Sequence, residues 1–418
     1  MSLIEELGKN SKSAARILRN TTTADKNRAL LLTAEEINKN KAAILLANKQ
    51  DLQAADGEIS HALLERLELT EKRINSMIDG LMQIAALPDP VGEITGIKTT
   101  AKGLKIGRMR APIGTIAMIY ESRPNVTIDA AGLCLKSGNA VILRGGREAM
   151  NSNLALLSCM QNALKIANIP EHAVQLIKNP DRKIVSEMLA AREYIDVLIP
   201  RGGKGLVELV AREATMPTIK HLEGICHIFV DKYADLDKAL NICDNAKTYR
   251  YGICGAMETL LIHREIADEF LPKIAAIYRQ KAVEIRGCAK TCKILSDLGI
   301  ESVAATEEDW STEYLAAVIS IKIVDDFNTA VGHIETYSSG HTDAIITENL
   351  TAANQFLQEV NSASVMINTP TCFADGYEYG LGAEIGISTD KIHWRGPVAL
   401  EGLTCEKFIV MSDGIIRK

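Results

Sequence analysis

The chain has 418 residues and a formal net charge of −6, and 47% of its residues are hydrophobic and 24% charged. This composition is typical of a globular protein and excludes disordered, collagen-like and coiled-coil classes. The near-balanced charge argues against a general nucleic-acid or polybasic membrane binder, so we expect neither partner. No apolar run is long enough to span a bilayer, and residues 1–20 predict an amphipathic helix rather than a signal peptide. We therefore expect a cytoplasmic protein.

The nine cysteines have irregular spacings, and none forms a C-x-x-C pair. An odd number in a reducing compartment argues against a disulfide framework. Cys288 and Cys292 are separated by three residues, but no second ligand pair follows at the spacing of a zinc site, so we expect no bound metal. Most of the cysteines are expected to be small buried hydrophobes. Whether one of them is a nucleophile is open at this point.

Helical periodicity dominates the first 90 residues. It predicts one or two helices over residues 23–55 and another over 71–86, which ends before Pro88. Alternating residues around Gly103 then predict a β-hairpin over 92–110. This hairpin is either an ordinary surface feature or an arm used for oligomerisation.

An alternation of strands and helices follows, which indicates parallel sheets covered on both faces, with ligands at the carboxyl ends of the strands. The first unit has expected strands at 115–120, 139–143, 174–177 and 194–199 and expected helices at 128–135, 148–167, 181–190 and 204–212. The second has expected strands near Ile228 and at 259–262, 317–324, 343–346 and 364–367, and expected helices at 235–247, 265–279 and 329–336. Residues 404–410 predict a last strand that could pair with the early hairpin.

Two glycine turns each join an expected strand to an expected helix. Gly202 and Gly203 lack the flanking residues of a P-loop, so they form either a phosphate site at a helix N-terminus or a plain turn. Gly145 and Gly146 lie between Arg144 and Arg147. A purely structural turn would not need two arginines, and we therefore expect an anionic ligand there.

Cys254 lies in the small-residue turn Gly252-Ile-Cys-Gly-Ala256, between an expected helix and an expected strand. This is not the usual setting of a core cysteine. Lys247 and Arg250 are close in sequence, and a nearby cation would favour the thiolate. Cys254 is therefore the candidate nucleophile.

The order of these motifs resembles the aldehyde dehydrogenase superfamily from about Ala24 to Val410. Within it, several long motifs are similar to the γ-glutamyl phosphate reductase family. They are Tyr120-Glu-Ser-Arg-Pro-Asn-Val-Thr127, Ile142-Leu-Arg-Gly-Gly146, Leu198-Ile-Pro-Arg-Gly-Gly203, Ser339-Gly-His-Thr-Asp343 and Gly380-Leu-Gly-Ala-Glu-Ile-Gly-Ile-Ser388. Members of that family reduce γ-glutamyl phosphate with NADPH to glutamate 5-semialdehyde and phosphate, the second step of proline biosynthesis.

The resemblance implies an aldehyde-dehydrogenase-like α/β fold with two Rossmann-like domains of parallel sheet and a small β arm for oligomerisation. Residues 1–225 with 362–394 would form the NADPH-binding domain, and residues 226–361 the catalytic domain. Residues 92–111 with 395–418 would form the arm. We expect a homo-oligomer, either a dimer or a tetramer.

The resemblance also implies catalytic roles. Cys254 occupies the nucleophile position, where its thiolate would form a thioester and expel phosphate. Asn125 occupies the position that donates to the oxyanion, with the backbone N–H of Cys254 as the second donor. His221 aligns with the glutamate that serves hydrolytic relatives as general base, which suits an enzyme that must not hydrolyse its thioester. Glu223, two residues on, is an alternative base.

Cofactor and substrate contacts follow in the same way. Arg147 replaces a glutamate that holds the ribose in NAD-preferring relatives, and a cation there predicts NADPH. Other expected cofactor contacts are Arg144, Gly145, Gly146, Gly202, Gly203 and Glu313. Expected contacts to the small-molecule substrate, which carries a phosphate, a carboxylate and an amine, are Arg123, Arg250, His341, Asp343 and Glu384; His333 is expected to be structural.

Two other functions compete with this one: an oxidising aldehyde dehydrogenase that needs no phosphate, and a scaffold without catalysis. A transient association with glutamate 5-kinase is a further hypothesis, because the acyl phosphate that the kinase would supply is labile.

Overall fold

The computed structural model describes residues 2–417, so Met1 and Lys418, which fall within the predicted first helix and arm, lie outside the described part. The chain forms two compact units. Unit 1 contains the residues up to Lys220, Gly380–Gly386 and the residues from Val398 onward, and unit 2 contains His221–Tyr379 and Ile387–Pro397. None of the helices in residues 2–417 combines the length and hydrophobicity that crossing a bilayer requires.

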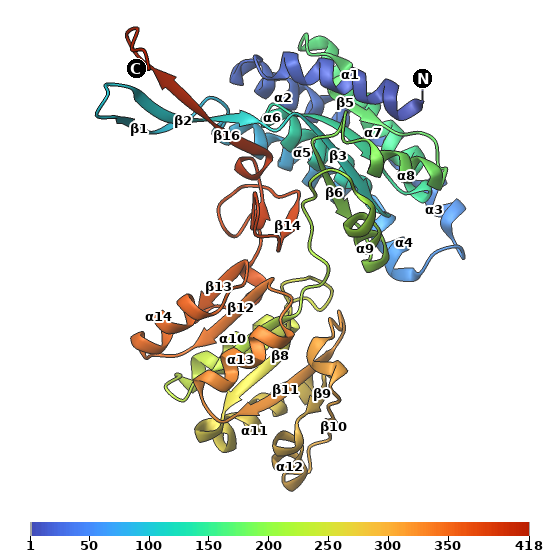
Figure 1. Ribbon diagram of the computed structural model, residues 1–418. Helices are drawn as coiled ribbons and strands as arrows, with labels where there is room; N and C mark the ends of the chain where they lie inside the picture. The colour runs from blue at the N-terminus through green and yellow to red at the C-terminus, as the bar shows by residue number, and fades with distance from the viewer. Residues whose placement is uncertain (1, 418) are drawn as a thin grey trace. The chain divides into compact units, whose positions relative to one another are not determined.

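Unit 1 begins with helices and continues into a parallel sheet (Figure 1). The helices are α1 (Leu3–Leu18), α2 (Thr23–Lys39), α3 (Lys41–Ala55), α4 (His61–Leu67) and α5 (Glu71–Ala86). Ser2, Thr22 and Thr70 cap α1, α2 and α5 by accepting a backbone N–H of the first turn, and this explains where these helices begin.

The sheet of unit 1 has the parallel order β5-β4-β3-β6. Its strands are β3 (Thr115–Tyr120), β4 (Ala140–Arg144), β5 (Val174–Leu176) and β6 (Val197–Arg201), and its helices are α6 (Pro124–Lys136), α7 (Met150–Ile166), α8 (Arg182–Ala190) and α9 (Lys204–Glu213), with short 3₁₀ turns η1 (Arg147–Ala149) and η2 (Glu171–Ala173). Every residue of β3 is buried, as expected for a central strand covered on both faces.

A three-stranded antiparallel sheet projects from unit 1 and forms the arm (Figure 1). It contains β1 (Ile94–Thr99), β2 (Lys105–Pro112) and β16 (Thr404–Met411), and the short turn η5 (Glu401–Leu403) precedes β16. The register of β16 on β2 runs from Thr404↔Pro112 to Met411↔Lys105. The predicted pairing of the C-terminal strand with the hairpin is thus confirmed.

Unit 2 contains a seven-stranded parallel sheet in the order β10-β9-β11-β8-β7-β12-β13. Its strands are β7 (Cys226–Val230), β8 (Met257–His263), β9 (Glu284–Gly287), β10 (Val303–Ala304), β11 (Val318–Val324), β12 (Thr342–Ile346) and β13 (Ser364–Ile367). Its helices are α10 (Leu236–Thr248), α11 (Arg264–Gln280), α12 (Ala289–Asp297), α13 (Phe327–Tyr337) and α14 (Leu350–Glu359), with 3₁₀ turns η3 (Glu308–Ser311) and η4 (Thr371–Phe373). The short strands β14 (Gly386–Ser388) and β15 (Gly396–Val398) form a separate two-stranded sheet.

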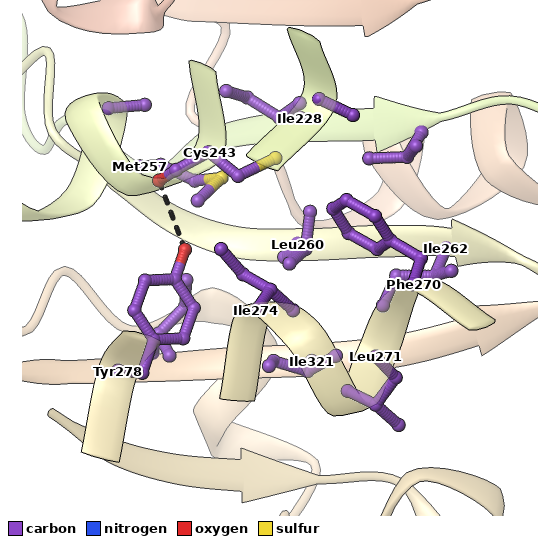
Figure 2. Close-up of a cluster of buried hydrophobic side chains, with 14 of the residues drawn as sticks. Ile228, Cys243, Met257, Leu260, Ile262, Phe270, Leu271, Ile274, Tyr278 and Ile321 are labelled. Atoms are coloured by element: carbon purple, nitrogen blue, oxygen red, sulfur yellow. Dashed lines mark hydrogen bonds between the residues drawn. The ribbon is translucent and has the colours of Figure 1, made fainter. Parts of the chain in front are cut away.

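Figure 2 shows the core of unit 2, where aliphatic side chains of β8 pack against Phe270, Ile274 and Tyr278 of α11. The hydroxyl of Tyr278 donates to the carbonyl oxygen of Cys243 on α10 at 3.0 Å. This hydrogen bond satisfies a buried polar group and ties α11 to α10, the helix that leads to Cys254.

The α/β fold with two parallel sheets and a β arm is as predicted, whereas the two compact units divide the chain at other residues than the expected domains. Residues 221–225, 362–379 and 387–394, expected in the cofactor domain, belong to unit 2, and so do residues 395–397, expected in the arm. The reason is strand pairing: β13 hydrogen-bonds in parallel to β12 and extends the sheet of unit 2.

Candidate active site

Cys254 lies in the turn between α10 and β8, where its side chain is half-buried. The thiol of Cys226, at the start of β7, donates to the carbonyl oxygen of Cys254 at 3.2 Å. Burial, reinforced by the negative charge of Asp343, raises the pKa of Cys226 well above its usual range. The Cys226 thiol therefore stays protonated at neutral pH and keeps holding the turn.

Two glycines let the backbone pass close to this turn. A Cβ placed on Gly224 would lie 2.7 Å from both the Cα and the carbonyl carbon of Cys254. On Gly255, a Cβ would lie 3.1 Å from the carbonyl oxygen of Thr371. Close packing thus explains Gly224 and Gly255, whereas a Cβ on Gly252 would meet nothing within 4 Å.

Two histidines accompany Cys254. The sulfur of Cys254 and one ring nitrogen each of His221 and His341 all lie within 4.8 Å of one another. The two rings pack edge to face, with centroids 5.5 Å apart. Nδ1 of His221 lies 2.9 Å from the carbonyl oxygen of Ile387. A carbonyl only accepts, so Nδ1 carries the hydrogen and Nε2 of the neutral ring carries the lone pair.

His341 is fully buried, directly before β12. Its Nδ1 lies 2.9 Å from Oγ1 of Thr342 and 3.6 Å from Sγ of Cys226. His341 was expected to bind substrate; it lies beside Cys254, and its role in substrate binding stays a prediction. His221 and His341 lie 33 and 87 residues from Cys254 along the chain, and no local motif links them.

Lys247 does not serve Cys254 as the nearby cation that the sequence suggested. Its Nζ lies 2.6 Å from Oε2 of Glu258, and both side chains are buried. Burial lowers the pKa of Lys247 and raises the pKa of Glu258 to about 7. The pair joins α10 to β8 on either side of the Cys254 turn. Arg250, the other candidate, is exposed.

Asp343, expected to contact the substrate, is fully buried, and that role stays a prediction. Its carboxylate accepts the backbone N–H of His227 at 2.9 Å, the hydroxyl of Ser338 at 2.7 Å and the hydroxyl of Ser362. These bonds fix the loop that precedes His341. Asp343 thus supports the site from beneath. His333, expected to be structural, is also buried on α13.

In unit 1, Asn125 lies in the first turn of α6, and its amide donates to Oδ2 of Asp129 at 2.9 Å. Burial raises the pKa of Asp129 to about 6, against the opposing charge of Arg201. Arg123 precedes the helix and is half-buried. Asp129 and Arg201 were not predicted, although both lie within the quoted motifs or next to them.

The turn after β4 places Arg144 and Arg147 at the carboxyl end of the strand. Nη2 of Arg144 donates to the carbonyl oxygen of Pro180 at 3.3 Å, and Arg147 is exposed. A Cβ on Gly145 would lie 3.2 Å from the ring of Tyr120, and one on Gly146 would meet the carboxyl group of Glu148. Packing accounts for Gly145, whereas at Gly146 only the end of the Glu148 side chain would have to move. The cofactor contacts expected of these glycines and of the two arginines stay predictions.

The turn after β6 leads to the N-terminus of α9 at Gly203. The backbone N–H of Gly203 donates to Oε2 of Glu121 at 2.8 Å. An N–H group at this helix N-terminus is thus satisfied by a carboxylate oxygen, and whether the turn is a phosphate site or a plain turn stays a prediction. Gly202 and Gly203 are exposed, so the turn is accessible.

Two further predicted residues are Glu313 and Glu384. Glu313 lies half-buried between η3 and β11, and its charge contributes to the raised pKa of Cys226. Glu384 is half-buried in unit 1. Their roles stay predictions.

Comparisons with known proteins agree with this geometry. The aldehyde dehydrogenase family model matches residues 2–287. The structure of γ-glutamyl phosphate reductase from Thermotoga maritima is 46% identical, with a TM-score of 0.97 and full coverage of both chains. That of γ-glutamyl phosphate reductase from Saccharomyces cerevisiae is 30% identical, with a TM-score of 0.56, and covers 100% of this chain and 99% of its own. An acetylating aldehyde dehydrogenase from Geobacillus thermoglucosidasius shares the fold at 16% identity and a TM-score of 0.69, covering 99% and 97% of the two chains.

Proposed function

We propose that this chain, which belongs to the aldehyde dehydrogenase family, is an NADPH-dependent γ-glutamyl phosphate reductase. It reduces L-glutamate 5-phosphate to L-glutamate 5-semialdehyde and releases phosphate, in the second step of proline biosynthesis. The observation that carries the chemistry is the setting of Cys254. This cysteine lies in a tight turn, and one ring nitrogen each of His221 and His341 lies within 4.8 Å of its sulfur.

Cys254 attacks the γ-carbonyl carbon as a thiolate, and phosphate leaves as the thioester forms. This covalent route replaces one difficult step by two easier ones. The lone pair on Nε2 of His221 makes that ring a candidate acceptor for the thiol proton. Cys226 and Gly224 both contact the backbone of Cys254, and these contacts hold the turn that carries the sulfur in place.

Asn125 is proposed as a donor to the oxyanion of the tetrahedral intermediates. Its hydrogen bond to Asp129 fixes the orientation of its amide on α6. A side-chain donor of this kind is worth about 10²–10³ in rate. Arg123, Arg250 and Glu384 stay candidates for the charged groups of the substrate.

The residues of unit 1 fit the cofactor. Arg144 and Arg147 would hold the adenosine ribose and its 2′-phosphate, and the turn at Gly202 and Gly203 would hold the pyrophosphate, as its N–H group already binds a carboxylate oxygen. Glu313 would contact the nicotinamide ribose. When bound, NADPH supplies the hydride that reduces the thioester.

Phosphate dependence tests the proposal. In the reverse direction, purified protein with glutamate 5-semialdehyde is expected to reduce NADP⁺ only when phosphate is added. Cys254→Ser should abolish this activity, whereas Cys405→Ser, at an exposed cysteine on β16, should not. Oxidation to free glutamate without phosphate would instead indicate a hydrolytic aldehyde dehydrogenase, and full activity of Cys254→Ser would refute the mechanism.

The arm supports a homo-oligomer as part of this proposal. Ile97 on β1 and Phe408 and Val410 on β16 are 53%, 69% and 57% exposed, which is unusual for strand residues of this size. A second copy of the chain would cover them. A cytoplasmic location and transient association with glutamate 5-kinase complete the proposal, and co-sedimentation of the two purified enzymes would test the association.

A further inference from the structure

Three soft or borderline metal ligands converge in unit 2: the sulfur of Cys254, a ring nitrogen of His221 and a ring nitrogen of His341. All of the ligand atoms lie within 4.8 Å of one another. In a tetrahedral Zn²⁺ site, such sulfur and nitrogen atoms lie about 3.3–3.5 Å apart, given Zn–S and Zn–N bonds of about 2.3 and 2.0 Å. Closing the difference requires shifts of about 1 Å, which side-chain rotation can supply.

The surroundings of the histidines match those of metal ligands. Nδ1 of His221 donates to the carbonyl oxygen of Ile387 at 2.9 Å. A metal-binding histidine is held in this way, with the second ring nitrogen donating to a carbonyl or carboxylate. His341 is anchored through Nδ1 near Thr342, and it directly precedes β12, so its backbone is fixed by the sheet.

We propose that Cys254, His221 and His341 form a binding site for a soft divalent cation, Zn²⁺ in particular, which inhibits the enzyme reversibly. Coordination forms a sulfur–metal bond and releases the thiol proton to solvent. The fourth position of the metal stays open to water, as in sites with three protein ligands. The metal withdraws negative charge from the sulfur and occupies the space beside it, so the bound sulfur attacks an acyl phosphate far more slowly than the free thiolate does.

The neighbouring cysteine does not compete for the metal. The thiol of Cys226 donates to the carbonyl oxygen of Cys254 at 3.2 Å, so its hydrogen is already engaged there. The site therefore offers one sulfur and two imidazole nitrogens. That ligand set favours Zn²⁺ over Mg²⁺ or Ca²⁺, which prefer oxygen.

Cation binding can be tested without turnover. The reduced, metal-free, full-length protein is titrated with Co²⁺, whose sulfur-to-metal absorption band reports a thiolate ligand. One equivalent should produce this band, and Zn²⁺ should abolish it. Cys254→Ser should remove the band. His221→Gln and His341→Gln should each weaken binding by more than tenfold, because loss of a group that merely orients a ligand already costs about 10–100-fold.

Matched controls are Cys292→Ser and His172→Gln, at a cysteine on α12 and an exposed histidine in unit 1, which should leave the band unchanged. A band that persists in Cys254→Ser, or no band at one equivalent, would overturn the site.

The inhibition rests on the proposed function and is measured separately. Zn²⁺ should slow alkylation of Cys254 by iodoacetamide in the same concentration range in which it slows NADP⁺ reduction. If the titration succeeds and no turnover is found, the proposed function fails but the site stands.

Discussion

Gly224→Ala is expected to damage catalysis more than stability. Gly224 is buried beside the Cys254 turn, and an added Cβ would lie 2.7 Å from the Cα and carbonyl carbon of Cys254, and closer still to its carbonyl oxygen. Cβ atoms essentially never approach other atoms within 3.0 Å, and ordinary contacts begin at 3.4 Å. The neighbouring atoms are backbone, so no flexible side chain can move aside.

The structure sets the size of the effect. Moving from 2.7 Å to at least 3.4 Å displaces the backbone of Cys254 by roughly 0.7–1 Å. The shift would also lengthen the hydrogen bond from Cys226. A misplacement of about 1 Å in a reacting group costs about 10²-fold in rate. We therefore expect kcat to fall by about 10² while the KM for NADP⁺, whose adenosine and pyrophosphate groups we propose to bind to residues of unit 1, changes little.

The assay is phosphate-dependent reduction of NADP⁺, with urea unfolding of each variant measured in parallel. Gly332→Ala is the matched control, because a Cβ there meets nothing within 4 Å on the exposed face of α13. It should keep wild-type turnover and gain up to about 1 kcal/mol from removing a helical glycine. If Gly224→Ala kept kcat within about threefold of the wild type while folded, the argument that backbone contact positions the sulfur would be wrong.

Three further predictions concern charges. Lys247→Met should lower the free energy of unfolding by about 3–5 kcal/mol, because it leaves Glu258 buried and unpaired. The double variant Lys247→Met/Glu258→Met should recover most of this loss. The control Lys232→Met, which breaks a surface ion pair, should lower the free energy of unfolding by less than about 1 kcal/mol. Asp129 has a folded-state pKa of about 6, above its unfolded value, so its contribution to stability is present below about pH 4 and lost as the pH rises through 6. The free energy of unfolding of Asp129→Asn should therefore increase relative to that of the wild type over this pH range. A difference that does not change with pH in urea titrations would contradict this prediction. Arg147→Glu should raise the KM for NADPH by about 10–100-fold and leave the KM for NADH unchanged or lower. Arg147→Lys is the control that conserves the charge. An unchanged ratio of the two KM values in Arg147→Glu would show that Arg147 does not select the cofactor.

Hydrophobic patterning predicts the elements that lie in the cores of the two sheets. β3 and β13 begin and end at the predicted residues, and α5 does so as well. The elements that the periodicity does not reveal include two strands at the edge of unit 2: β9, with one exposed and one half-buried residue among its four, and β10, with both residues exposed. A strand that buries few side chains leaves little apolar pattern to detect.

The candidate site divides in the same way. The turn around Cys254 is recognisable because a cysteine among glycines is a local feature. The approach of His221 and His341 is not, because it depends on the sheet order β8-β7-β12, which places three distant segments next to one another. Lys247 shows the opposite case. It is near Cys254 in sequence and was expected to favour its thiolate, but it forms an ion pair with the buried carboxylate of Glu258 on β8.

The edge of the sheet that carries the chemistry also differs between the units. In unit 1, the residues proposed for the cofactor follow the carboxyl ends of β4 and β6, where ligands were expected. In unit 2, Cys254 and His341 precede the amino ends of β8 and β12, and His221 precedes β7, which contradicts that expectation. The segment before Cys254 is the C-terminus of α10, whose dipole end is negative and does not favour a thiolate as a helix N-terminus would. With Lys247 paired elsewhere, the two imidazoles are the groups left to take up the thiol proton, and for that reason the same three atoms suit a metal ion.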